Sequence, residues 1–266
     1  MKNVFKAMLA MSVVALTLPV QAFAQAPAPA AAAVAAQPSA EEITAAQAIN
    51  IMPTNNAAEV NARNSEVDKF VLKFPASTLN GFLFTLAGEA SQKVQDSNKA
   101  KFYYEKAIQA DPTSDYAMIM LGAEIANGTK EYDLDKADKL TRATKLANDG
   151  LALIEKRTKA PQEPQADFDA SKKDDKARAQ MTLGLIALAG QKYEEAGTKF
   201  LLAVETAQNA DASNLLRAGM AFNQGKKWDD ANKALDRFIA TPGMPDQYKK
   251  MAEEEKKRGD TLRKQK

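Results

Sequence analysis

The side chains that most often carry out chemistry in proteins are missing from this sequence. Its 266 residues include neither cysteine nor histidine. The absence of these two residue types excludes disulfides, thiolate nucleophiles, imidazole bases and nearly every zinc, haem or iron–sulfur site that proteins build. Aspartate, glutamate, lysine, tyrosine and serine remain as candidates for acid–base or nucleophilic chemistry.

Two short motifs that suggest chemistry have simpler explanations. The segment from Gly219 to Lys226 resembles a phosphate-binding loop in part, but five residues separate its glycines instead of four, and Lys227 replaces the Ser or Thr that would bind magnesium. The pair Asp174 and Asp175 is flanked by lysines, which is typical of a solvated helix face. Because no set of polar residues converges, we predict no catalytic, cofactor-binding or metal-binding residues, and a protein that is not an enzyme.

The charge balance argues against a nucleic-acid partner. The whole chain has 36 Lys and Arg residues against 34 Asp and Glu residues. Lys2 and Lys6 account for the difference, so the chain after residue 24 is formally neutral. General binders of nucleic acid or of anionic membranes need an excess of basic residues.

The segment 1–24 has the pattern of a secretory signal peptide. Two lysines precede an uncharged, mostly apolar core from Ala7 to Val20, and Ala22-Phe23-Ala24 provides a small-x-small cleavage site. The alternative is an uncleaved membrane anchor, but a core of about 14 residues is shorter than the roughly 20 needed to span a bilayer. We therefore expect an exported protein, most simply a periplasmic one, without stable membrane insertion after cleavage.

The chain after the leader divides into a linker, a helical body and a charged end. Residues 25–38 are rich in Ala and Pro, which predicts a flexible linker. Ser39 and Glu42 form a potential capping box, and apolar residues at helical spacing follow it, so residues 39–74 are expected to form a leading helical pair or a degenerate repeat. Residues 243–266 are charged on most faces and predict a C-terminal capping helix or tail.

Between these ends, a pattern of small and large residues recurs at a period close to 34. In residues 177–203, Leu183-Gly184 lies in one apolar run, and a second stripe of Tyr193, Ala196, Phe200 and Ala203 follows at helical spacing. A glycine inside a helix costs about 0.5–1 kcal/mol relative to alanine. Its recurrence therefore predicts close approach of two helices at each site, with glycines 88, 122, 184 and 219 facing alanines 100, 137, 196 and 231.

This pattern resembles the tetratricopeptide repeat, a helix-turn-helix unit of about 34 residues. The resemblance covers about residues 78–242 as four partial matches. It implies an all-α fold, an α-solenoid of helix-turn-helix repeats. It also implies a non-enzymatic scaffold or adaptor that mediates protein–protein interactions.

One interval departs from the period. The distance along the chain from Gly122 to Gly184 is well over one period but too short for another full repeat, and the extra length is centred on residues 149–176. One interpretation is a helical hairpin that projects from the solenoid, with each arm lengthened by about nine residues or roughly 13 Å. The other is a disordered insertion, which the lysine-rich stretch at 172–176 and two nearby prolines favour.

The resemblance also implies a binding face, because the first helices of such repeats line a concave surface. The positions carried over by repeat phase are largely apolar in this chain, and an exposed apolar stripe usually marks a contact site. Three alternatives are open for them: burial in the protein's own core, a groove for a peptide or protein segment, and self-association. The candidate binding residues are Tyr116, Ile119, Ala123, Met181, Leu185, Leu188, Leu216, Met220 and Asn223.

The function expected from these residues is that of an exported scaffold, with a peptide or protein segment bound on this face. The family's clamp for C-terminal carboxylates uses Lys, Asn and Arg at such positions, and Arg178 alone matches it here, so binding of a chaperone tail has no support. The alternative function is a structural homo-oligomer of the cell envelope. No cofactor is expected.

Overall fold

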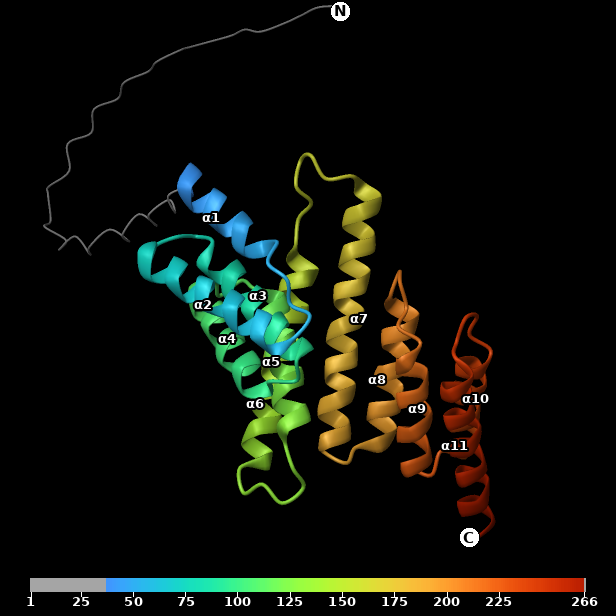
Figure 1. The fold of residues 1–266 in the computed structure, drawn as a ribbon. Coiled ribbons are helices and arrows are strands. Elements are labelled where there is room, and N and C mark those ends of the chain that lie inside the picture. Colours follow the sequence, from blue (N-terminus) through green and yellow to red (C-terminus); the bar gives the residue numbers. More distant parts are fainter. Residues whose placement is uncertain (1–36, 266) are drawn as a thin grey trace, which may run out of the picture. The chain divides into compact units, whose positions relative to one another are not determined.

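The computed structural model of the chain describes residues 37–265. This part of the chain is all-helical, and its eleven helices are joined by turns and short loops (Figure 1). The all-α prediction is confirmed. The predicted signal peptide, residues 1–24, and the predicted linker up to residue 36 lie outside the described residues.

Successive helices pack against their neighbours in the chain, as in a helical repeat solenoid. The leading pair consists of α1 (Ala40–Asn50) and α2 (Ala57–Lys73), and α1 opens with the predicted capping box of Ser39 and Glu42. The closest packing is within the helix pairs that follow and between α8 and α9. These pairs are α3 (Asn80–Lys93) with α4 (Ser97–Ala110), α5 (Asp115–Gly128) with α6 (Lys136–Lys156), α7 (Gln165–Ala189) with α8 (Tyr193–Thr206), and α9 (Ser213–Gln224) with α10 (Trp228–Ile239).

Helix pairs meet where the recurrent glycines lie. A Cβ atom added to Gly88 or Gly184 would lie 2.7 Å from a ring carbon of the facing aromatic residue, Tyr104 or Phe200. The same atom on Gly219 would lie 2.4 Å from Leu235. No side chain fits at these three positions without displacing a neighbour, which is the physical reason for glycine.

The second pair departs from the predicted pattern. Ala137, the alanine expected to face Gly122, is exposed in the first turn of α6. The buried alanine at this contact is Ala143, whose carbonyl oxygen would lie 3.1 Å from a Cβ on Gly122. The prediction was wrong because α6 begins only at Lys136, so the small residue that meets α5 comes later in the sequence.

The turn within a repeat has the same geometry in three of the four pairs. Gln95, Gln191 and Lys226 all have a positive φ, between 59° and 61°. After each of them, the next backbone N–H donates to a carbonyl five residues earlier, at 2.8–2.9 Å. This is the Schellman arrangement that ends a helix and satisfies its last carbonyl groups.

The insertion is helical. Helix α6 has 21 residues and α7 has 25, whereas α3 and α4 have 14 each, and residues 157–164 join the two long helices. The structure thus has the hairpin rather than the disordered segment. The hairpin does not project freely, because Ile154 and Phe168 are buried and α7 also packs directly against α5.

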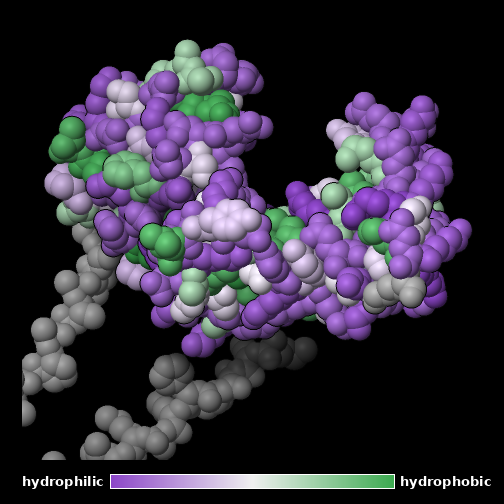
Figure 2. All heavy atoms as spheres, turned by 90° about the horizontal axis from the view of Figure 1, so that it is seen from below, coloured by the Kyte–Doolittle hydropathy of each residue, from purple (hydrophilic) through white to green (hydrophobic). Residues whose placement is uncertain are grey.

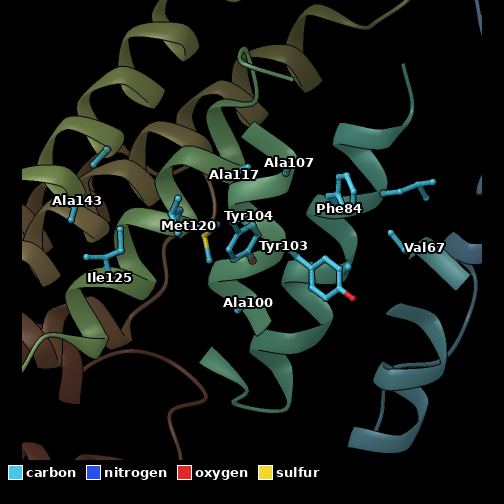
Figure 3. Packing of buried hydrophobic residues seen from close by; sticks show 14 of the residues in the cluster. Val67, Phe84, Ala100, Tyr103, Tyr104, Ala107, Ala117, Met120, Ile125 and Ala143 are labelled. Atoms are coloured by element: carbon cyan, nitrogen blue, oxygen red, sulfur yellow. The ribbon is translucent and has the colours of Figure 1, made fainter. Parts of the chain in front are cut away.

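The apolar core is divided into clusters along the chain. The largest joins α1–α7, and Figure 3 shows Tyr103 and Tyr104 of α4 between Phe84 of α3 and Met120 of α5. A second cluster joins α7–α10, and a third joins α9 and α10 to the terminal helix α11 (Asp246–Lys264) through buried Ala252. Each cluster therefore depends on contacts between adjacent helices.

Candidate functional site

All nine candidate binding residues lie on the first helices of the pairs, α5, α7 and α9, but they differ in burial. Ile119, Ala123 and Asn223 are buried, which corrects their assignment to an accessible face. The other six are at least partly exposed. They are Tyr116 on α5; Met181, Leu185 and Leu188 on α7; and Leu216 and Met220 on α9.

The departures from the repeat pattern explain why two of these residues are buried. Ile119 packs with Ile154 and Ala179, which belong to the lengthened helices α6 and α7. Asn223 lies beneath the terminal helix, where its amide donates to the main-chain oxygen of Glu255 at 3.0 Å and Gly259 leaves room for it. Ala123 is buried on α5, a helix that packs directly against both α6 and α7.

The remaining apolar residues of α7 and α9 form what we call the apolar strip: Met181, Leu185, Leu188, Leu216 and Met220. Four of them pack in part against the second and third core clusters, and Met220 is the most exposed, at 38%. Figure 2 shows hydrophobic side chains in small patches among hydrophilic ones on the face that it draws. The strip thus combines core packing with accessible apolar surface.

A network of charged and aromatic side chains borders the strip at Tyr116. The Arg178 guanidinium stacks on the Tyr116 ring, 4.7 Å from its centre, and forms an ion pair with Asp175. Asp175 also binds Arg157 at 2.7 Å, and Arg157 binds Asp115 of α5 at 2.7 Å. This network links the hairpin to the second repeat.

The hydroxyl of Tyr116 lies in a partly buried, negatively charged environment. Burial raises the pKa of Tyr116 well above its usual value, and the hydrogen bond to Glu89 with the nearby Glu89 charge raises it further.

The acidic pair at 174–175 is not a solvated face. Asp175 lies between two arginines, and Asp174 accepts hydrogen bonds from the backbone N–H groups of Gln208 and Asn209 at 2.7 and 2.9 Å. The Asn209 amide donates to the same carboxylate at 2.9 Å. Partial burial opposes ionisation, but these hydrogen bonds lower the pKa of Asp174 below its ordinary value. The sequence pattern missed this role because the partners lie beyond the next helix, in the loop between α8 and α9.

A cavity of about 300 Å³ lies beside the strip, between α7, α8 and the start of α9. We call it the α7–α9 cavity. Its apolar lining is Met120, Ala177, Met181, Ala203 and Ala207, and its polar lining includes Arg178 and Asn214.

Two other kinds of site are absent from the described part of the chain. Within residues 37–265, no three side chains of the metal-ligating types lie close enough together to hold an ion. The same residues contain no helix of the length and apolar character that crossing a bilayer requires.

A family model described as tetratricopeptide repeat matches residues 213–241, which contain α9, the turn with Lys226 in the left-handed conformation, and α10. No curated protein matches the chain.

Proposed function

We propose that this chain is a non-enzymatic scaffold with a peptide- or protein-binding apolar strip, because the matched segment and the eleven consecutive helices of residues 37–265 fit a tetratricopeptide repeat protein. Repeats of this family suggest a protein–protein interaction scaffold. Solenoids of stacked repeats offer extended surfaces for such contacts.

The observation that supports the strip as the binding surface is its partial exposure. Each square ångström of apolar surface that a partner covers contributes about 25 cal/mol. Met181 and Met220 have flexible, polarisable side chains that adapt to different apolar partners. The three buried candidates cannot take part, so the proposed surface is confined to α7 and α9, with Tyr116 at its border.

We further propose that the chain is exported to the periplasm, as the leader pattern of residues 1–24 favours. The intact mass of the protein recovered from the periplasmic fraction tests this proposal. A mass that begins at Gln25 supports it, and a mass that retains the leader in the cytoplasmic fraction contradicts it.

Affinity capture from an envelope extract tests the strip. Wild type is compared with the double variant Leu185→Glu/Met220→Glu and with Leu134→Glu, a matched control in the α5–α6 loop whose side chain is fully exposed. We expect partners that wild type and the control retain and the double variant loses. Identical partner sets from all three proteins contradict the proposal.

A structural homo-oligomer is the second candidate function. Apolar side chains are exposed at both ends of the described chain. At the N-terminal end these are Ile51 and Leu72 of the leading pair, and at the C-terminal end they are Tyr248 and Met251 of α11. Such surface at the ends of a solenoid favours end-to-end association. Light scattering over a hundredfold range of concentration separates the two functions. A constant monomer mass contradicts the oligomer, and a dimer abolished by Leu185→Glu/Met220→Glu contradicts a groove for another protein.

A further inference from the structure

Helix α11 covers the C-terminal end of the apolar strip. Leu216, Met220 and Asn223 follow one another at helical spacing, so they lie on one face of α9. Met220 is 38% exposed, whereas Asn223 is only 2% exposed because α11 lies against it. Asn223 is therefore excluded from the strip only as long as α11, the last helix in Figure 1, stays in this place.

The contact at Asn223 is made to the main chain of α11. The Asn223 amide donates to the main-chain oxygen of Glu255 at 3.0 Å and to the Glu255 carboxylate at 2.8 Å. Because both partners are acceptors, the atom that faces them is Nδ2, and the orientation of the amide is fixed. The Oδ1 atom of the same amide is buried and has no hydrogen-bond partner among residues 37–265.

A helix cannot satisfy both halves of this amide. The main-chain N–H groups inside a helix already donate to carbonyl oxygens one turn earlier, so none is available for Oδ1. An extended segment has free N–H and C=O groups, so it can donate to Oδ1 and accept from Nδ2. The unpartnered Oδ1 thus indicates that an extended main chain fits Asn223 better than α11 does.

Little apolar surface holds α11 in place. Only Ala252 and Gly259 are buried among its 19 residues. Its large apolar side chains, Tyr248, Met251 and Leu262, are all more than one-third exposed. Hydrophobic stabilisation grows with the apolar area removed from water, so the two small buried residues contribute little of it.

Polar contacts between α10 and α11 supply much of the attachment. They are two ion pairs, Lys256 with Asp236 and Arg263 with Asp229, and a hydrogen bond from Asn232 to Asp260. The side chains of both ion pairs are partly or largely exposed. Exposed ion pairs stabilise weakly and are screened by salt, so the attachment of α11 should weaken as ionic strength rises.

We propose that α11 is a displaceable cover over a main-chain recognition site at Asn223, and that an extended, apolar segment of a partner protein takes its place. The inference rests on the proposed scaffold function and extends the apolar strip from Met220 to Asn223. Displacement of α11 needs rotation only in residues 241–245, because α11 is the last helix and packs chiefly on α10.

Hydrogen exchange of the full chain tests whether α11 detaches. We expect α11 amides to exchange at least about tenfold faster than those of α9 and α10, because opening of α11 leaves those two helices folded. Raising the salt concentration from about 0.05 M to about 0.5 M should speed only the exchange of α11, by about threefold or more. Equal protection of the three helices, or exchange of α11 that is independent of salt, overturns the proposal.

Two double variants test the ion pairs. Lys256→Gln/Arg263→Gln removes both pairs. Lys250→Gln/Lys257→Gln is the matched control, because it changes the charge of α11 equally at exposed lysines that form no ion pair within residues 37–265. We expect the first variant to speed exchange of α11 about threefold or more and to lose the salt dependence, and the control to behave as wild type. Equal behaviour of the two variants contradicts attachment by these pairs.

The blocked peptide acetyl-Ala-Leu-Ala-Leu-Ala-amide is a suitable probe of the site. Its analogue with a methyl group on every residue's main-chain nitrogen keeps the side chains but lacks those N–H donors. The ¹⁵N side-chain amide signal of Asn223, identified by its absence from Asn223→Ser, reports binding. We expect a saturable shift with the first peptide and at least about tenfold weaker binding of the analogue. No saturable shift, or equal binding of both peptides, overturns the proposal.

A cross-link between α10 and α11 tests the displacement. The chain has no cysteine, so Asn232→Cys/Asp260→Cys has only two thiols, which a short bifunctional thiol reagent can join. The cross-link leaves Asn223, Glu255 and Gly259 unchanged. The linked protein should lose peptide binding, and the same variant with each thiol blocked separately should bind at least as tightly as wild type. Equal binding by the linked and blocked proteins overturns the proposal.

The two proposals fail in different ways. If Leu185→Glu/Met220→Glu abolishes partner capture while the cross-link changes neither capture nor peptide binding, the cover is wrong and the scaffold function stands. If the cross-link abolishes peptide binding but capture is insensitive to the strip variant, the Asn223 site stands and the strip is not the binding surface. Should the cysteine variant fail to fold, the ion-pair variants and the N-methylated peptide decide the question.

Discussion

At the scale of single residues, glycine positions determine how closely the helices approach. Gly184 faces the ring of Phe200 with no room for a methyl group, whereas a Cβ on Gly128 at the end of α5 would meet only the tip of Lys101, 3.8 Å away. Both residues are helical, so they differ in packing and not in backbone conformation.

Gly184→Ala is therefore expected to destabilise the protein by about 1–3 kcal/mol, the usual cost of overpacking a core. This loss exceeds the roughly 0.5–1 kcal/mol that alanine adds inside a helix. Gly128→Ala, the matched control, is expected to be neutral or stabilising. Urea denaturation of the three proteins measures the difference, and equal stability of the two variants would contradict the packing argument.

The Asp174 carboxylate should make the stability of the folded protein depend on pH. Its pKa is lowered in the folded protein, so its contribution to stability is complete above the ordinary value of 3.8 and is lost as pH falls through the folded value. The stability difference between wild type and Asp174→Asn should be constant above about pH 5 and shrink below pH 4. Denaturation at a series of pH values checks this, and a difference that grows on acidification would exclude the assigned role.

The residue scale also shows what sequence reasoning could and could not reach. The close approach of helices at the recurrent glycines could be predicted from periodicity alone. Glycine destabilises a helix, so its recurrence at the same position of each repeat indicates that a larger side chain would not fit there. The exposure of Ala137 did not follow, because it depends on where α6 begins, and the pairing of Asp175 with Arg157 did not follow, because it depends on how α7 lies beside the end of α6. For Ile119, Ala123 and Asn223 the structure realises burial in the protein's own core, one of the three alternatives that the sequence left open.

At the scale of elements, the terminal helix illustrates how a solenoid covers its last repeat. Helix α11 packs on α10 and α9, and Asn223 donates to Glu255 at the contact. A Cβ on Gly259 would lie 2.4 Å from the Asn223 side-chain oxygen. The position admits only a residue without a side chain.

Gly259→Ala is accordingly expected to loosen α11 and lower stability by about 1–3 kcal/mol. Asn223→Ser makes room for the added methyl group, so the double variant should lose less than the sum of the two single variants. Chemical denaturation of the four proteins gives the coupling. Strict additivity would mean that the two residues do not meet.

The helices themselves were largely predictable, since their apolar stripes, capping box and breaks are local features. The sequence left open whether the insertion is a helical hairpin or disordered, because its charged residues are compatible with both. The structure shows why it is ordered: buried Ile154 and Phe168 and the paired Arg157 anchor it to the second repeat. Such long-range contacts have no signature in a single sequence.

At the scale of the whole molecule, stability is arranged along the chain. The core clusters of α1–α7 and α9–α11 are separate, and each helix pair depends on its neighbours. Solenoids with this organisation unfold in parts when one region is weakened. A defect near the C-terminus should therefore stay local.

Leu235→Ala tests this organisation, because Leu235 is fully buried in the third cluster. We expect a loss of about 2–5 kcal/mol at the C-terminal pair. In native-state hydrogen exchange, amides of α9–α11 should lose protection while those of α3–α5 keep theirs. Uniform loss of protection along the chain would instead indicate a single cooperative unit.

The long hairpin has a consequence for how this chain can be altered. Helices α6 and α7 run in opposite directions and are joined by residues 157–164 (Figure 1). If each helix is lengthened by the same number of turns at this end, the two helices still end side by side. The later repeats keep their phase, because Gly219 follows Gly184 after an interval close to one period. The hairpin tip is therefore a grafting point, where foreign sequence can be inserted or removed in matched lengths without shifting the frame of the repeats on either side.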